Sequence, residues 1–171
     1  PTHPFASSAS GLAGRIEVFS PRGVRGPDRP PLDALDARVE GRVLVAGSRS
    51  ALAAIAAARL RPEAEVEVFH MDAYESLRAR EALARNGAGR VRPQIGADLP
   101  QDAAFDWVLL AVPRAGDSLL NAELVREAHA ALKPRGKILA ATDNARDRWL
   151  HDRILEAFGA ATIHARSKQG T

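Results

Sequence analysis

The residues best placed to do chemistry in this chain stand where its apolar runs end. Gly47 follows the run Arg42–Ala46 and opens the segment Gly47–Ala51, and His70 follows the run Val66–Phe69. A glycine after a strand lets backbone N–H groups approach a ligand closely, and a histidine at a strand end is a candidate ligand contact. These two positions predict a binding site.

Other kinds of reactive site find no support in the sequence. The chain has no cysteine, which excludes disulfides, thiolate metal sites and cysteine nucleophiles. Its histidines lack the spacing of metal-ligand motifs; they are His3, His70, His129, His151 and His164. Ser48 does not stand in a Gly-x-Ser-x-Gly nucleophile elbow. We therefore assign no catalytic residue and no metal site.

Positive charge is concentrated in a few places, although the formal net charge is only +3. Lys133, Arg135 and Lys137 cluster around one turn, Arg114 follows an apolar run, and four arginines lie between residues 15 and 29. Such groups suit the phosphate backbone of a nucleic acid, and the competing interpretation is that they are ordinary solvated side chains. We predict Arg114, Lys133, Arg135 and Lys137 as contacts to a nucleic acid, which the family resemblance described below implies to be RNA.

The elements that position these residues alternate between strands and helices. Apolar runs predict strands at Arg42–Ala46, Val66–Phe69, Val91–Ile95, Trp107–Val112, Lys137–Ala141 and Thr162–Ala165, and helical patterns cover Ala51–Leu60, Ala73–Asn86, Leu119–Leu132 and Arg146–Phe158. Asp72 and either Asp117 or Ser118 are predicted helix N-caps, and Gly87 a helix stop. The strict alternation predicts a doubly wound α/β fold with a mostly parallel sheet, whose ligands bind beyond the carboxyl ends of the strands.

The first forty residues differ from the rest of the chain. They hold six of its eleven prolines, so we predict a leader (1–40) packed on the surface without regular structure, followed by one compact domain (41–171). There is neither an apolar run of membrane length nor a signal-peptide pattern. We expect a cytoplasmic protein without membrane contact.

Several segments, taken in order, resemble a known family over residues 14 to 171. They are Gly41–Gly47, Val66–Asp72, Glu75–Gly87, Phe105–Pro113 and Leu132–Leu139, the last containing Lys-Pro-Arg-Gly. This order and spacing resemble the class I S-adenosylmethionine-dependent methyltransferases, in particular the small-domain enzymes that modify guanine in ribosomal RNA. The resemblance implies a Rossmann-like sheet whose last, antiparallel strand is incomplete here.

The cofactor loop of that family reads acid-x-Gly-x-Gly-x-Gly, and this chain departs from it. Gly47 is kept, but Val45 stands at the acid, and Arg49 and Ala51 stand at the second and third glycines. An arginine adds bulk and charge where backbone must approach the cofactor.

The positions that would hold the rest of the cofactor have changed too. His70 stands at the carboxylate that accepts hydrogen bonds from the ribose, and a neutral imidazole offers one acceptor nitrogen. The contact to adenine falls near Gly96, with Asp98 two residues further on. Gly47, His70 and Asp98 are therefore the candidate cofactor contacts, if a cofactor binds.

The catalytic turn has lost its characteristic groups. The family reads Asn-Pro-Pro-Phe, and the matching residues here are Ala111, Val112, Pro113 and Arg114. Neither the amide that orients the target base nor the aromatic ring that stacks on it remains.

These losses resemble the degenerate amino-terminal domain of the two-domain members of the family, as do the leader Arg15–Asp28 and the segment Ala141–Arg146. The resemblance implies a non-catalytic module that binds no cofactor. Such a module helps a methyltransferase to bind ribosomal RNA or a ribosomal subunit, and it stabilises a downstream catalytic domain. The alternative is an active S-adenosylmethionine-dependent RNA methyltransferase with a divergent pocket. A Rossmann dinucleotide binder is the third interpretation, and it lacks two of three fingerprint glycines.

Overall fold

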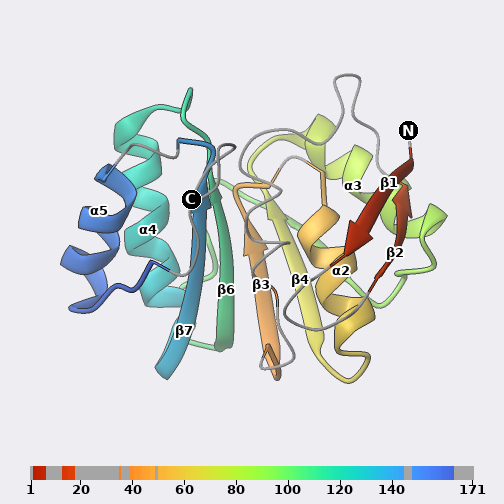
Figure 1. The fold of residues 1–171 in the computed structure, drawn as a ribbon, viewed down its shortest axis with the longest axis horizontal. Coiled ribbons are helices and arrows are strands. Elements are labelled where there is room, and N and C mark those ends of the chain that lie inside the picture. Colours follow the sequence, from red (N-terminus) through yellow and green to blue (C-terminus); the bar gives the residue numbers. More distant parts are fainter. Residues whose placement is uncertain are drawn as a thin grey trace.

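A computed structural model describes residues 2–6, 13–17, 35, 39–48, 50–144 and 148–163. Its centre is a five-stranded sheet with the order β5-β4-β3-β6-β7, in which every neighbouring pair is parallel (Figure 1). The strands are β3 (Arg42–Ala46), β4 (Glu65–His70), β5 (Arg92–Ile95), β6 (Phe105–Val112) and β7 (Leu132–Thr142). The doubly wound parallel sheet that the sequence predicts is confirmed.

Four helices cover the two faces of this sheet. They are α2 (Leu52–Leu60), α3 (Ala73–Arg85), α4 (Ser118–Ala131) and α5 (Trp149–Phe158). α2 and α3 lie on one face, and α4 and α5 on the other (Figure 1). The central strands are apolar on both sides because each face carries a helical layer: Val43 and Val45 pack under α2, whereas Leu44 packs on the opposite side. Seven successive residues of the alanine-rich α2 are buried.

The helix ends follow local sequence signals. The Asp72 carboxylate accepts a hydrogen bond from the backbone N–H of Glu75 at 2.9 Å, and the Asp117 carboxylate accepts one from that of Leu119 at 2.7 Å. Both are N-caps, and Asp117 rather than Ser118 is the one that caps α4. α3 ends just before Gly87, whose φ of 63° is the left-handed conformation typical of a helix stop.

The structure differs from the predicted elements in several places. The proline-rich leader is not without regular structure, because β1 (Thr2–Ala6) and β2 (Ala13–Glu17) form an antiparallel pair. The alternation is broken once, since residues 96–104 connect β5 to β6 without a helix. α5 begins at Trp149, three residues later than the predicted start at residue 146, which itself lies outside the described residues. Residues 162 and 163 are not in a strand, and the rest of the strand predicted at 162–165 also lies outside them.

The segment Lys133–Gly136 is part of β7 rather than a turn before it. Phe105 is opposite Leu132 and Trp107 is opposite Lys137, so four residues of β7 face the single residue Asp106. The extra length is absorbed as a bulge, in which Arg135 has a φ of 69°.

Candidate functional site

The carboxyl ends of the parallel strands meet at one edge of the sheet, which we call the carboxyl edge. Gly47 follows β3, His70 ends β4, Gly96 follows β5 and Arg114 lies two residues beyond β6. The ends of β4 and β5 are joined by a hydrogen bond from the Gly96 N–H to the His70 carbonyl at 3.3 Å. This edge is where folds of this type bind ligands.

Gly47 is held in place by packing. Its φ is 71°, and a Cβ added there would lie 2.0 Å from the carbonyl oxygen of Ala111 at the end of β6. No side chain fits in that space, because the neighbouring atoms belong to the backbone. The close approach of β3 to β6 therefore requires glycine whether or not a cofactor binds.

The described residues of the loop after Gly47, which are Ser48, Ser50 and Ala51, are buried. Ser48 and Ser50 are 3% and 8% exposed, and the Ser48 hydroxyl accepts a hydrogen bond from the Ser50 N–H at 3.4 Å. Ala51 precedes α2 with a φ of 52° and is fully buried. It thus keeps, at some cost for an alanine, the left-handed backbone that a glycine adopts freely. Arg49, at the family's second glycine, lies outside the described residues.

His70, at the ribose position, is sealed inside the protein. The side chain is 2% exposed, and both ring nitrogens are buried without a hydrogen-bond partner among the described residues. Alternation along β4 places it on the same face as Val66 and Val68, beneath α2 and α3. Burial lowers the pKa of His70, and the nearby Asp72 carboxylate offsets this in part. The imidazole is therefore neutral, with one donor and one acceptor unused.

Asp98 lies on the side of the sheet that α4 and α5 cover. It is exposed in the segment that connects β5 to β6, and the next residue, Leu99, packs in the core beneath α4. The Leu99 N–H donates to the buried carboxylate of Glu127 on α4 at 3.0 Å. Burial raises the pKa of Glu127, and repulsion from Asp98 adds to the rise. His70 and Asp98, two of the three candidate cofactor contacts, thus lie toward opposite sides of the sheet.

Backbone groups of the turn after β6 form hydrogen bonds within the protein. The Pro113 carbonyl accepts from the Gly116 N–H at 3.1 Å and from the Asn121 side-chain amide at 3.4 Å. The Arg114 N–H donates to the Asp143 carboxylate at 2.6 Å, which joins this turn to the end of β7. The Arg114 residue is itself exposed.

The four predicted RNA contacts do not form one group. Arg114 lies at the carboxyl edge, whereas Lys133, Arg135 and Lys137 lie at the opposite, amino edge. The eight residues of β6 separate the two edges by about 23 Å, at roughly 3.3 Å a residue. Arg135 is exposed, and Lys137 places its Nζ 5.3 Å from the centre of the Trp107 ring.

Lys133 belongs to a polar network that the sequence analysis missed. Its Nζ lies 2.9 Å from the Asp106 carboxylate, which also accepts from the Arg42 N–H at 2.8 Å. These hydrogen bonds, that from Arg42 first, lower the pKa of Asp106. The Arg42 guanidinium in turn donates to the buried Glu67 at 2.9 Å, which raises the pKa of Arg42. The only sequence signals were single acids inside the apolar runs around Glu67 and Asp106.

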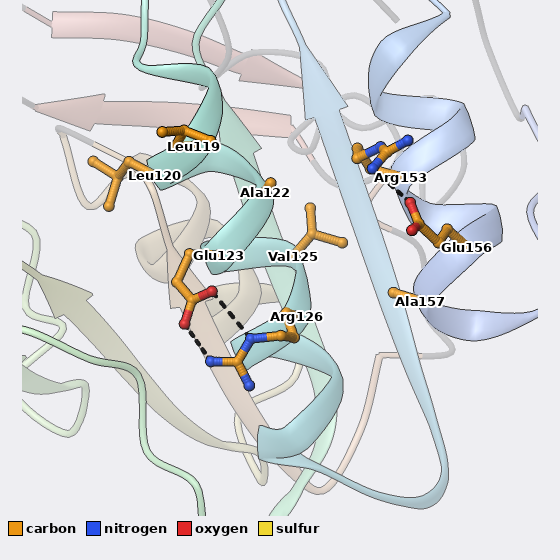
Figure 2. A pocket seen from close by; sticks show the side chains of 9 residues that line it. All are labelled: Leu119, Leu120, Ala122, Glu123, Val125, Arg126, Arg153, Glu156 and Ala157. Atoms are coloured by element: carbon orange, nitrogen blue, oxygen red, sulfur yellow. Dashed lines mark hydrogen bonds and ion pairs between the residues drawn. The ribbon is translucent and has the colours of Figure 1, made fainter.

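A groove of about 660 Å³ runs between α4 and α5 (Figure 2). Its apolar lining includes Leu119, Leu120, Ala122, Val125 and Ala157. Each helix adds one ion pair within itself, Glu123 with Arg126 and Arg153 with Glu156. Because each acid is paired with an arginine of its own helix, the groove offers no acid–base pair for catalysis.

Among the residues that the structure describes, no group of three or more histidine, aspartate or glutamate side chains is arranged to hold a metal ion. No helix in the same part of the chain has the length and apolarity needed to cross a membrane.

Comparison with known proteins places the fold. No protein-family model and no curated protein matches the sequence, but 181 solved chains match the structure. One is a precorrin-6y C5,15-methyltransferase from Geobacter metallireducens, with a TM-score of 0.56 at 21% identity over 72% of this chain and 66% of its own. The chain has the class I methyltransferase fold. PigF, solved with SAH, matches with a TM-score of 0.64 at 13% identity over 84% of this chain and 59% of its own.

A third methyltransferase-fold neighbour, the S-adenosylmethionine-dependent methyltransferase SibL, has 27% identity and a TM-score of 0.52 over 71% of this chain and 37% of its own. The chain therefore spans only part of these neighbours. The predicted fold class is confirmed, and the likeness to class I methyltransferases is confirmed at the level of the fold. The narrower resemblance to ribosomal RNA guanine methyltransferases stays a prediction.

Proposed function

We propose that this chain is a non-catalytic module of the methyltransferase fold that helps a ribosomal RNA guanine methyltransferase to bind its RNA and that stabilises a catalytic domain. Its partners are ribosomal RNA, free or in a ribosomal subunit, and that catalytic domain. The proposed location is the cytoplasm, which a chain without cysteine suits. The module needs no cofactor for this role.

The closed ribose position is the observation that carries the proposal. A methyl donor bound at the carboxyl edge has to reach the side chain at the end of β4, and here that side chain, His70, is 2% exposed. The neutral imidazole also lacks the two acceptor oxygens of the carboxylate that the family uses.

One observation favours the alternative, an active S-adenosylmethionine-dependent RNA methyltransferase. A buried polar group without a partner costs about 1–3 kcal/mol, and both ring nitrogens of His70 are in this state. A ribose hydroxyl would satisfy them if the residues that cover His70 moved aside. Gly47 and Asp98 would be its other cofactor contacts.

Titration calorimetry with S-adenosylmethionine and with S-adenosylhomocysteine separates the two functions. We expect no saturable binding to the wild-type chain up to millimolar ligand, and none to His70→Leu. Micromolar binding that is lost in His70→Leu would establish the alternative instead. Thermal unfolding of both proteins serves as the control for folding.

The RNA role is tested by the affinity for a fragment of small-subunit ribosomal RNA at several salt concentrations. Neutralising a residue that contacts phosphate should weaken binding and lower the slope of log affinity against log salt by about one. Arg114→Ala probes the carboxyl edge, and the pair Arg135→Ala and Lys137→Gln the amino edge. Lys133 is left intact because it pairs with Asp106.

Arg92→Ala is the matched control for these variants. Arg92 is exposed at the amino edge, but β5 lies at the far side of the sheet from β7. Its loss should leave the affinity unchanged. Absence of salt-sensitive binding to the wild-type chain would refute the RNA role.

A further inference from the structure

Four exposed apolar side chains flank the point where β4 and β5 end. They are Met71 (38% exposed), Tyr74 (58%), Leu77 (55%) and Ile95 (52%), and we call them the Tyr74 patch. Ile95 is the pairing neighbour of His70, Met71 follows His70, and α3 begins two residues later. The patch is therefore part of the carboxyl edge, on the side away from β7.

Tyr74 stands out within this patch. Among the phenylalanine, tyrosine and tryptophan side chains that the structure describes, Tyr74 is the one that is largely exposed. The Arg78 guanidinium lies 5.1 Å from the centre of its ring and pairs with Glu81 at 2.8 Å. With this cation beside the ring, Tyr74 is still 58% exposed.

This arrangement suits an unpaired nucleic-acid base. Bases stack on exposed aromatic rings whatever their sequence, and arginines nearby add cation–π and phosphate contacts. Arg80 is exposed on the same helix, and Arg114 lies on the same edge of the sheet. Only β3 separates β4 from β6, which places the ends of the two strands about 10 Å apart. Tyr74 lies four residues beyond the first of these ends and Arg114 two residues beyond the second.

We propose that Tyr74 is a stacking platform for an unpaired RNA base, and that the RNA strand runs along the carboxyl edge from Tyr74 to Arg114. The inference rests on the RNA role proposed above, and it selects the carboxyl edge over the amino edge. It also supplies an aromatic contact on α3, whereas the family's aromatic position after β6 is held by Arg114. An apolar patch that docks a protein is the competing explanation, and the Arg78 stack favours the base.

The test uses a single-stranded oligoribonucleotide that carries one fluorescent adenine analogue, whose emission is quenched by stacking. Tyr74→Ala should lower the affinity about tenfold to a hundredfold and abolish the quenching, while Tyr74→Phe retains both. The salt slope should stay unchanged in Tyr74→Ala, because stacking releases no counterions. Leu77→Ala, an equally exposed residue of the same patch, is the matched control and should bind as the wild type does.

The outcomes separate this inference from the proposed function. If Tyr74→Ala binds as tightly as the wild type while Arg135→Ala with Lys137→Gln weakens binding, the stacking site is refuted and the RNA role stands. Equal losses of affinity in Tyr74→Ala and Leu77→Ala, with no quenching in the wild type, would also refute it. If the patch instead binds a catalytic methyltransferase domain and both alanine variants release that domain without changing RNA affinity, it is a protein contact. A wild-type chain that binds no RNA removes both proposals.

Discussion

The two ends of the sheet differ in how the polar side chains of their strands are paired. Toward the amino edge, Asp106 accepts from the Arg42 N–H and from Lys133, and Glu67, in the middle of β4, accepts from Arg42 and Gln94. At the carboxyl edge, His70 is buried with two unpaired nitrogens. Each edge has a left-handed residue other than glycine, Ala51 at the carboxyl edge and Arg135 in the bulge of β7. The network around Asp106 and Glu67 joins strands, whereas the unpaired His70 costs stability.

On the proposed function, this difference separates the scaffold from a former cofactor site. Costly local features persist where a ligand needs them or where the surrounding packing dictates them. Gly47 belongs to the second kind, because backbone atoms of β6 fill the space around it. His70 and Ala51 are also buried, and they stand at positions that the family resemblance assigns to the cofactor. Substitutions at the two edges should therefore have different costs.

The largest effect is expected at Gly47. Gly47→Ala forces a Cβ to within 2.0 Å of a backbone oxygen, so β3 and β6 must move apart, and we expect a loss of about 4 kcal/mol or more in the free energy of unfolding. Gly87→Ala is the control, since Gly87 also has a positive φ but nothing within 4 Å of an added Cβ; it should cost about 1 kcal/mol. Urea unfolding measures both. Similar costs for the two variants would show that the close contact is not what holds Gly47.

The amino edge should respond next most strongly. Asp106→Ala leaves the Arg42 N–H without its acceptor and removes the ion pair with Lys133. The side chain is 37% exposed, so water compensates in part and we expect a cost of about 1–2 kcal/mol. Asp106→Asn keeps an oxygen for the backbone N–H and should cost about half as much. If Asp106→Ala were neutral in urea unfolding, the network would not stabilise the edge.

The sequence predicts those parts of the fold that depend on local signals. The bounds of β3 and the caps Asp72 and Asp117 agree with the structure, because apolar runs and capping side chains act over a few residues. The hairpin β1–β2 was missed, since prolines suggested irregular chain, yet Pro4 is accommodated within β1 of a two-stranded sheet. The bulge in β7 was missed because Pro134 and Gly136 predicted a turn there, whereas the same two residue types also occur at bulges within a strand.

The site was predicted less well than the fold. The carboxyl-edge positions of Gly47, His70 and Arg114 follow from strand order, but the sealing of His70 and the contact of Gly47 with Ala111 are tertiary facts. Strand direction alone separates Arg114 from Lys133, because one follows the end of β6 and the other lies near the start of β7. The exposure of Tyr74 depends on how α3 packs, which helical periodicity alone did not reveal.

His70 should make stability depend on pH. Its pKa is lowered in the folded state by burial, so below about pH 6.5 the unfolded chain binds a proton that the folded chain does not. This contribution to stability is complete above the unfolded pKa and is lost as the pH falls below it, by up to about 1.4 kcal/mol between about pH 7.5 and pH 5.5. Urea unfolding at several pH values should show this loss in the wild type and a smaller one in His70→Leu. Equal pH slopes would mean that the folded protein protonates His70 freely.

The smallest effect is expected at Ala51, at the family's third glycine. Ala51→Gly relieves the left-handed strain of about 1 kcal/mol, but it removes a fully buried methyl group that contributes about 0.8 kcal/mol, and glycine also loses more backbone entropy on folding. The terms nearly cancel, so urea unfolding should show a change of less than about 1 kcal/mol, far below that of Gly47→Ala. If Ala51→Gly raised the free energy of unfolding by much more than about 1 kcal/mol, the methyl group would be poorly packed and the loop would still favour glycine. A near-zero change means that alanine replaced glycine here with little loss of stability, which is the behaviour expected of a loop freed from holding a cofactor.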